Sequence, residues 1–365
     1  MTLPLIVDAH QDLAWNARTF GRDYTQSALE TRAREQAADS WAVAVNGQCT
    51  IGLPELLRGQ VAFVFSTLFA APRRRKASGW SGQTPAYATL NEARDLYAQQ
   101  LDDYYRLVDT SPVFTFVTRQ SDIDRVLASW GTPDERLVGL VPLMEGADAI
   151  RQPKEAEWWW ERGLRIVGLA WTRTRYAGGT GQPGPLTREG RRLLAAMADL
   201  GLILDLSHAS DEAYLEAIER FEGVVIASHA NPRACLNNPP RPERFLTDDM
   251  IKRMAERQGV MGIVPYNAFL STAWQLSDGK APVTLDHVTM MIDHICQLTG
   301  SAAHVGIGSD FDGGFGAESL PAEMDTVADL QKIGPALAAR GYTPTDIAAI
   351  LGGNWLSILR RGLPA

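Results

Sequence analysis

Eight short apolar runs, rich in β-branched residues, recur along the 365-residue chain and constrain its fold more than any other feature. They occupy residues 3–7, 61–69, 137–144, 164–171, 202–206, 224–228, 260–266 and 304–309. Nearly continuous apolar strands are typical of a parallel sheet that is buried on both faces. Segments of helical pattern lie between most of these runs. Eight strands alternating with helices predict a (β/α)8 TIM-type barrel, which we expect to form a single domain over residues 1–365.

The helical segments have readable ends. The segments 187–201, 210–223 and 247–259 each begin at a Ser or Thr suited to cap a helix and end near a glycine. A doubly wound open sheet is the structural alternative, but no G-x-G-x-x-G follows the first run, which weakens a nucleotide-binding version of it. The stretches 18–58 and 70–88 are long for simple connections. We expect them to be insertions after strands 1 and 2 that shape or cover the site.

Composition narrows the class of protein. The formal net charge is −8, which disfavours a nucleic-acid partner. Three cysteines, Cys49, Cys235 and Cys296, are too few and too scattered for a disulfide framework and fit a reducing compartment. We see neither a signal peptide nor about 18 uninterrupted apolar residues. We therefore expect a cytoplasmic protein without a membrane partner.

Metal-binding residue types follow the apolar runs at equivalent places. The strand-end residues are His10, Asp12, Glu145, His208, His229, Asp310 and Asp312, and Tyr266 ends the seventh run. In a barrel the carboxyl ends of all strands converge on one face, where active sites lie. One histidine after a strand is more often structural than a ligand. Here three of the chain's six histidines follow apolar runs together with the carboxylates, and this pattern favours a metal site. The other three, His287, His294 and His304, are interpreted as structural.

The chemistry of these side chains indicates divalent ions. Imidazole and carboxylate groups suit zinc and similar metals. Two neighbouring ions need a bridging carboxylate, and Glu145 is well placed to supply it. His10 and Asp12, two residues apart, are expected to grip one ion together.

Seven motifs in these regions carry a family resemblance. They are "DAHQDLAW", "MEGADAI", "LILDLSHAS", "VIASHANPRA", "RFLTDDMI", "HVGIGSDFDGG" and "ILGGNWLSILR", in this order along the chain. With them the sequence resembles the membrane (renal-type) dipeptidase family, peptidase family M19, within the metal-dependent amidohydrolase superfamily. The resemblance implies a dipeptidase whose small-molecule substrates are dipeptides.

Position by position, the resemblance also implies a site with two Zn²⁺ ions per chain. His10 and Asp12 would bind one ion and His208 and His229 the other, with Glu145 bridging the two. A hydroxide that bridges the metals would attack the peptide bond.

Two further roles come from the same resemblance. Asp310 would act as the acid and base, ionised at rest because the cations favour its charged form. Arg244, in "RFLTDD", would hold the substrate's terminal carboxylate. Asp312 is expected either to orient a ligand or to cap a glycine-rich turn.

Trp171 departs from the family pattern. The family carries at this position a histidine that polarises the scissile carbonyl, and we expect Arg173, Arg175 or Tyr176 to compensate. We place Trp171 and Tyr266 among the substrate-binding residues.

The departure keeps two alternatives open. One is another amidohydrolase reaction, on lactones or N-acyl amino acids, and the other is a non-catalytic metal- or ligand-binding relative. The sequence also leaves open a D-residue at the substrate's C-terminal position and a homodimer.

Overall fold

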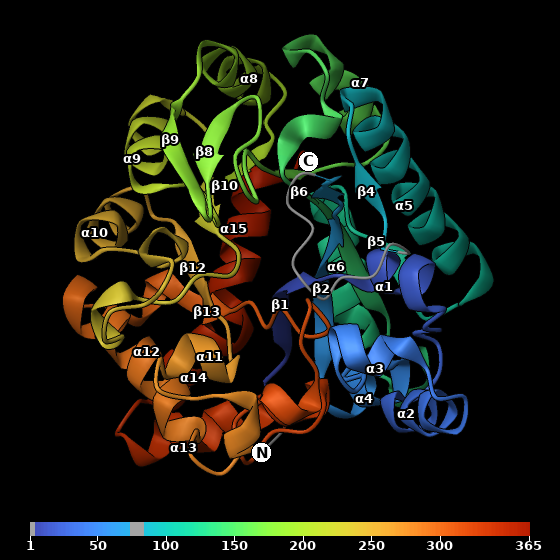
Figure 1. Ribbon diagram of the computed structural model, residues 1–365. Helices are drawn as coiled ribbons and strands as arrows, with labels where there is room; N and C mark the ends of the chain where they lie inside the picture. Colours follow the sequence, from blue (N-terminus) through green and yellow to red (C-terminus); the bar gives the residue numbers. More distant parts are fainter. Residues whose placement is uncertain (1–3, 74–83) are drawn as a thin grey trace.

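A closed barrel of parallel strands forms the centre of the computed structural model, which describes residues 4–73 and 84–365 (Figure 1). The barrel strands are β1 (Ile6–Gln11), β2 (Val61–Leu68), β6 (Val138–Glu145), β7 (Ile166–Gly168), β10 (Ile203–Asp205), β11 (Val225–Ala227), β12 (Val260–Ile263) and β13 (Val305–Ile307). Each pairs in parallel with its neighbours, and pairing of β2 with β6 closes the ring. The predicted (β/α)8 barrel is confirmed.

A ninth strand, β5 (Phe114–Phe116), was not predicted. It pairs with the first half of β6, where Phe114 lies opposite Val138. The second half of β6 pairs with β7, where Leu143 lies opposite Ile166. A run of three residues is too short to stand out as a strand in the sequence.

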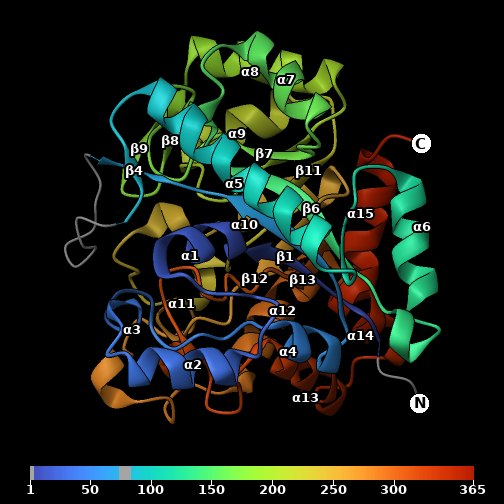
Figure 2. The ribbon, with the colours of Figure 1, turned by 90° about the vertical axis from the view of Figure 1, so that its right-hand side faces the viewer.

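Alternate strand residues form a buried apolar cluster together with the C-terminal helix α15 (Asn354–Gly362). The indole of Trp355 donates a hydrogen bond of 2.9 Å to the carbonyl of Ile307. Arg361 donates to the carbonyl of Gln258, which precedes β12. The last turn of helix α15 therefore lies near the amino end of β12, and the helix packs beside α6 (Gln120–Ser129) (Figure 2). The carboxyl ends remain for the site.

The other helices surround the barrel (Figure 1). They include α5 (Leu90–Thr110), α7 (Ala156–Glu161), α8 (Arg188–Asp199), α9 (Asp211–Arg220), α10 (Asp248–Glu256), α12 (Leu285–Thr299), α13 (Ile333–Ala339) and α14 (Pro344–Ala348). Thr187 and Thr247 cap α8 and α10 through their side chains, as predicted. Ser210 occupies the N-cap position of α9, but its hydroxyl donates to the Gly184 carbonyl instead.

The stretch 18–58 contains the end of α1 (Leu13–Phe20) and three further helices. These are α2 (Ala28–Ala37), α3 (Trp41–Asn46) and α4 (Leu53–Arg58). In the stretch 70–88 the structure describes β3 (Ala71–Pro72) and β4 (Ala86–Tyr87), while residues 74–83 lie outside the described residues. Among the helices of the described residues, none has the length and apolar character needed to cross a membrane.

Candidate active site

The predicted ligands meet at the carboxyl end of the barrel, around Glu145 at the end of β6. Its Oε1 lies 3.0 Å from His208 Nε2 and 3.3 Å from His229 Nε2. Its Oε2 lies on the other side, 3.8 Å from His10 Nε2. One carboxylate thus presents Oε2 to His10 and Oε1 to the pair His208 and His229, which is the arrangement expected of a residue that bridges two ions.

His10 and Asp12 form one side of this site. The register between β1 and β2 shifts between Asp8 and Gln11, so β1 carries a bulge there, and bulges often redirect side chains next to active sites. His10 Nε2 lies 4.0 Å from Asp12 Oδ1, and neither ring nitrogen of this fully buried histidine has a hydrogen-bond partner. The hydroxyl of Thr67, at the end of β2, donates to Asp12.

His208 and His229 form the other side, with their Nε2 atoms 2.9 Å apart. Each ring is held through its other nitrogen: His208 Nδ1 lies 2.9 Å from the hydroxyl of Thr180, and His229 Nδ1 lies 2.8 Å from that of Ser228. The φ angle of His208 is 64°, in the left-handed region that residues with a Cβ rarely adopt. Such backbone strain concentrates at functional sites.

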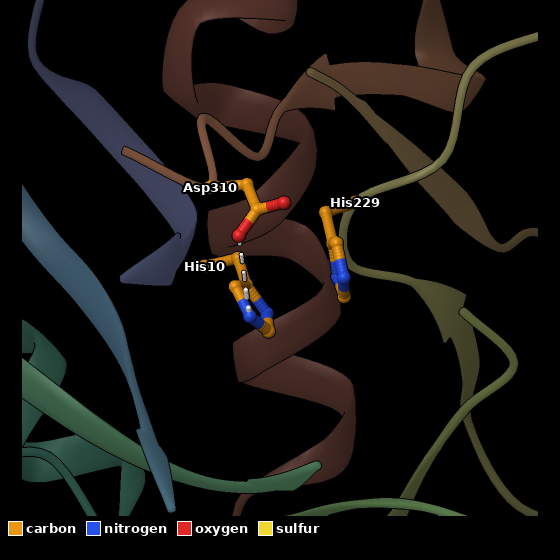
Figure 3. A group of neighbouring side chains, drawn as sticks. All are labelled: His10, His229 and Asp310. Carbon is orange, nitrogen blue, oxygen red and sulfur yellow. Dashed lines mark ion pairs between the residues drawn. The ribbon is translucent and has the colours of Figure 1, made fainter. Parts of the chain in front are cut away.

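Asp310, in the loop after β13, points into the same space as His10 and His229 (Figure 3). Its Oδ1 lies 3.9 Å from His10 Nε2. Its φ is also positive, at 57°. Within the described residues, three overlapping groups have donor atoms close enough to hold an ion: His10, His229 and Asp310; Glu145, His208 and His229; His10, Asp12 and Glu145.

The electrostatics of these groups fit divalent cations. Burial, reinforced by the charge of Arg244, lowers the pKa of His10 to about 3. Burial also lowers the pKa of His208 and of His229 well below the usual value, so all three imidazoles keep a free lone pair at neutral pH. Burial and then the charge of Asp12 raise the pKa of Glu145 well above its usual range. Crowded, buried carboxylates beside neutral imidazoles are a donor set that a cation would stabilise.

Arg244, at the end of a short 3₁₀ turn (Pro242–Arg244), places its positively charged guanidinium group in the site. It is only 4% exposed, and its Nη1 donates to the carbonyl of His229 at 2.9 Å. The guanidinium carbon lies 5.0 Å from the centre of the Phe269 ring. Its Nε and Nη2 are buried without a hydrogen-bond partner. This pair of donors suits a carboxylate that enters the site.

Comparison with known proteins identifies the family of this chain. The model of the membrane dipeptidase family, peptidase family M19, matches residues 1–362. The chain belongs to this family. Membership makes it a metallo-dipeptidase by class, a hydrolase, as the resemblance predicted.

Two relatives are dipeptidases by name. Dipeptidase aclJ of Aspergillus oryzae is 27% identical over 83% of this chain and 70% of its own length. An uncharacterized dipeptidase of Schizosaccharomyces pombe is 32% identical over 47% of this chain and 39% of its own length.

A solved structure shares the fold over the whole chain. The metallo peptidase from Rhodobacter sphaeroides, liganded with a phosphinate mimic of the dipeptide L-Ala-D-Ala, has a TM-score of 0.78 at 21% identity. The match covers 99% of this chain and 100% of that chain.

Two aromatic residues predicted to bind substrate lie at the ends of barrel strands. Tyr266, after β12, stacks on Phe315 with ring centres 4.2 Å apart and is half-buried. Burial, then the charge of Asp310, raises its pKa. Trp171, after β7, is also half-buried, with its ring centre 5.0 Å from that of Phe69 and 6.4 Å from that of His208. The indole thus forms a wall beside a predicted metal ligand.

The three residues expected to compensate for Trp171 donate hydrogen bonds to neighbouring loops. Arg173, Arg175 and Tyr176 direct side-chain hydrogen bonds to the backbone carbonyls of the neighbouring loops, at Pro183, Arg151 and Ile150 respectively. These contacts hold the loop after β7 in place. That one of the three replaces the family histidine stays a prediction.

Within the described residues, Asp312 pairs with groups other than the candidate metal ligands. It is fully buried and accepts hydrogen bonds from the hydroxyl of Tyr24 at 2.9 Å and from the backbone N–H of Thr50 at 2.8 Å. Both partners lie in the stretch 18–58. This insertion therefore supports the loop that carries Asp310. No local signal in the sequence indicated this contact.

Proposed function

We propose that the protein hydrolyses dipeptides with a free C-terminal carboxylate at a site holding two zinc ions. The observation that carries the proposal is the pairing of two features in one buried site. Glu145 presents one oxygen to His10 and the other to His208 and His229. Arg244 keeps two buried donors without hydrogen-bond partners.

The donor atoms proposed for each ion lie within 4.8 Å of one another in the described residues. His10 and Asp12 would hold one ion and His208 and His229 the other, with Glu145 shared. When bound, such a pair of divalent ions supplies an activated water near neutral pH and polarises the substrate carbonyl.

Arg244 positions the substrate. Its buried Nε and Nη2 can donate two parallel hydrogen bonds to one carboxylate, which fixes the substrate's C-terminal end. A fixed C-terminus places one particular peptide bond near the ligands, and this favours dipeptides over longer chains.

Asp310 moves the proton. Its carboxylate lies beside His10, within the ligand cluster, where it can accept the proton of the attacking water and pass it to the leaving amine. Burial raises the pKa of Asp310 well above its usual range, and Arg244 acts in the opposite direction. Nearby cations would lower this pKa further, so that Asp310 is ionised when the substrate binds.

A second candidate reaction is hydrolysis of N-acyl amino acids or lactones. Trp171 favours this second reaction. Its indole lies beside His208 and cannot polarise a carbonyl as an imidazole can. A non-catalytic metal-binding role is less well supported, because it gives no use to Asp310 or to the unpartnered donors of Arg244.

A substrate panel tests the proposal. Zinc-loaded protein is assayed on L,L- and L,D-dipeptides, their C-terminal amides, N-acyl amino acids and lactones. We expect turnover of free dipeptides above that of their amides. The Rhodobacter sphaeroides structure, with its mimic of L-Ala-D-Ala, supports including substrates with a C-terminal D-residue. Turnover of lactones or N-acyl amino acids alone would favour the second candidate, and no turnover would contradict both.

A further inference from the structure

Asp205 and Ser228 form a buried hydrogen-bonded clasp behind His229. Asp205 ends β10, and its Oδ1 accepts from the backbone N–H of Ser207 at 3.0 Å and from that of Ser228 at 2.9 Å. Its Oδ2 accepts from the hydroxyl of Ser228 at 2.5 Å. Three donors converge on this carboxylate, which is 2% exposed. The clasp joins the end of β10 to the residue that follows β11.

The backbone of Ser228 has little room to move. Its carbonyl oxygen faces Gly262 and Gly308, where a Cβ atom would lie 1.9 Å and 1.8 Å from it. Only glycine fits at both positions, because even one extra carbon would overlap this oxygen. The Ser228 hydroxyl is therefore presented to the ring of His229 from a fixed place.

The hydroxyl of Ser228 has one proton to donate, and its partners decide where that proton goes. Its short contact to Asp205 is of the length found for a hydroxyl donating to a carboxylate. The same oxygen lies 2.8 Å from Nδ1 of His229. With its proton directed to Asp205, Ser228 can only accept at this second contact, so Nδ1 must carry a proton.

We propose that Asp205 and Ser228 are positioning residues that set the tautomer of His229. With the proton on Nδ1, the lone pair of Nε2 faces Glu145, 3.3 Å from Oε1, on the side where the ion of the proposed function would bind. Metal-ligating histidines usually donate their other ring N–H to a carboxylate or a carbonyl. Here a serine lies between the carboxylate and the ring. The inference rests on the metal site of the proposed function, but not on its substrate.

The molecule contains a matched control. Asp8 in β1 makes the same clasp to Ser309, accepting from its backbone N–H at 2.7 Å and from its hydroxyl at 2.5 Å. Ser309 precedes Asp310 as Ser228 precedes His229. Its hydroxyl, however, accepts from the backbone N–H of Phe311 at 3.2 Å, and no hydrogen bond joins it to an imidazole in the described residues. Ser309→Ala therefore removes an equivalent clasp and leaves the contacts among Asp205, Ser228 and His229 unchanged.

The direct test is the tautomer of His229 in metal-free protein, read from ¹⁵N chemical shifts of the ring nitrogens. The signals are assigned by their loss in His229→Gln. We expect a single neutral tautomer protonated at Nδ1 in the wild type, and loss of this preference in Ser228→Ala and Asp205→Asn. Ser309→Ala should keep the wild-type signals. Protonation at Nε2 in the wild type would overturn the proposal, and this result does not depend on the folding of Ser228→Ala or Asp205→Asn.

Zinc affinity gives a second readout that needs no activity. In competition with a chelator, Ser228→Ala and Asp205→Asn should weaken the binding of one of two ions by roughly 10–100-fold. Ser309→Ala should weaken it far less. Equal losses in all three variants would mean that the clasp is only structural. If the protein turns over no dipeptide but shows both expected results, the proposed reaction is contradicted. The proposal that Asp205 and Ser228 set the tautomer of His229 then still holds.

Discussion

Arg22 and Asp312 form an ion pair in which both side chains are fully buried, with Nη1 3.3 Å from Oδ2. Arg22 lies in the insertion after β1, the first barrel strand, and Asp312 lies in the loop after β13, the last one. The pair therefore joins the segments that follow the first and the last strand. Arg22 is itself held by Glu35, at 2.8 Å between Nε and Oε1. The insertion thus supports the site loop from behind.

Asp312→Ala should therefore lower the free energy of unfolding by about 3–5 kcal/mol, because it removes one buried partner of Arg22 and also leaves the buried donors of Tyr24 and Thr50 without their acceptor. Urea denaturation measures the change. The control is Asp325→Ala, since Asp325 pairs with Arg32 at the surface and is 55% exposed. That variant should lose about 1 kcal/mol or less. Similar losses in both variants would argue against a bracing role for the buried pair.

Asp310→Asn should keep the metals and lose turnover. Asparagine cannot accept the proton, and general acid–base catalysis is typically worth about 10²–10⁴-fold in rate. Metal content and kcat are measured on the same preparation. Near-normal kcat in a fully loaded variant would show that another group carries the proton.

Arg244→Ala should impair free dipeptides far more than their C-terminal amides. Loss of a hydrogen bond to a charged group should cost about 1.5–3 kcal/mol in kcat/KM for the free acid. Arg253→Ala serves as control, because Arg253 pairs with Asp249 and Glu219 on the surface of the protein. Equal losses on acid and amide would mean that Arg244 does not bind the carboxylate.

The sequence predicted the barrel, and it placed the candidate ligands at the strand ends, because both predictions depend on local patterns. An apolar run followed by His10 or Glu145 is visible in a few residues, and the fold brings the strand ends together. The supporting contacts were not visible. The clasp of Asp205 with Ser228 depends on strand register, and Arg22 meets Asp312 only once the chain has closed on itself.

We expect about two divalent ions per chain, bound with release of protons. Burial raises the pKa of Asp12 to about 6, and the pKa values of Glu145 and Asp310 are raised well above their usual range. The metal-free site therefore retains protons near pH 6 that the ions must displace, so affinity should fall as the pH falls through 6. Calorimetry in buffers of different ionisation enthalpy measures the released protons. Trace metal after reconstitution would contradict the binuclear site.

The same shifts predict how the ions change stability with pH. Carboxyl groups with raised pKa values stabilise the folded metal-free protein when protonated, and this contribution is lost as the pH rises through the folded-state value, about 6 for Asp12. Bound cations would remove that loss. The rise in Tm on adding zinc should therefore be larger at pH 7.5 than at pH 5.5, and a larger rise at the lower pH would contradict this account.

Trp171 tests how far this chain departs from its family in substrate choice. Its ring centre lies 5.0 Å from that of Phe69 and 6.4 Å from that of His208, a predicted metal ligand. We therefore expect the indole to narrow the site. Trp171→Ala should then accept bulkier substrates. Trp171→His should raise kcat on ordinary dipeptides, because one added donor to a developing oxyanion is typically worth about 10²–10³-fold. We would compare kcat/KM across one dipeptide panel for the wild type and both variants, with Tm measured alongside. A lowered Tm with unchanged relative rates would mean that Trp171 only packs against Phe69 and has no part in selecting the substrate.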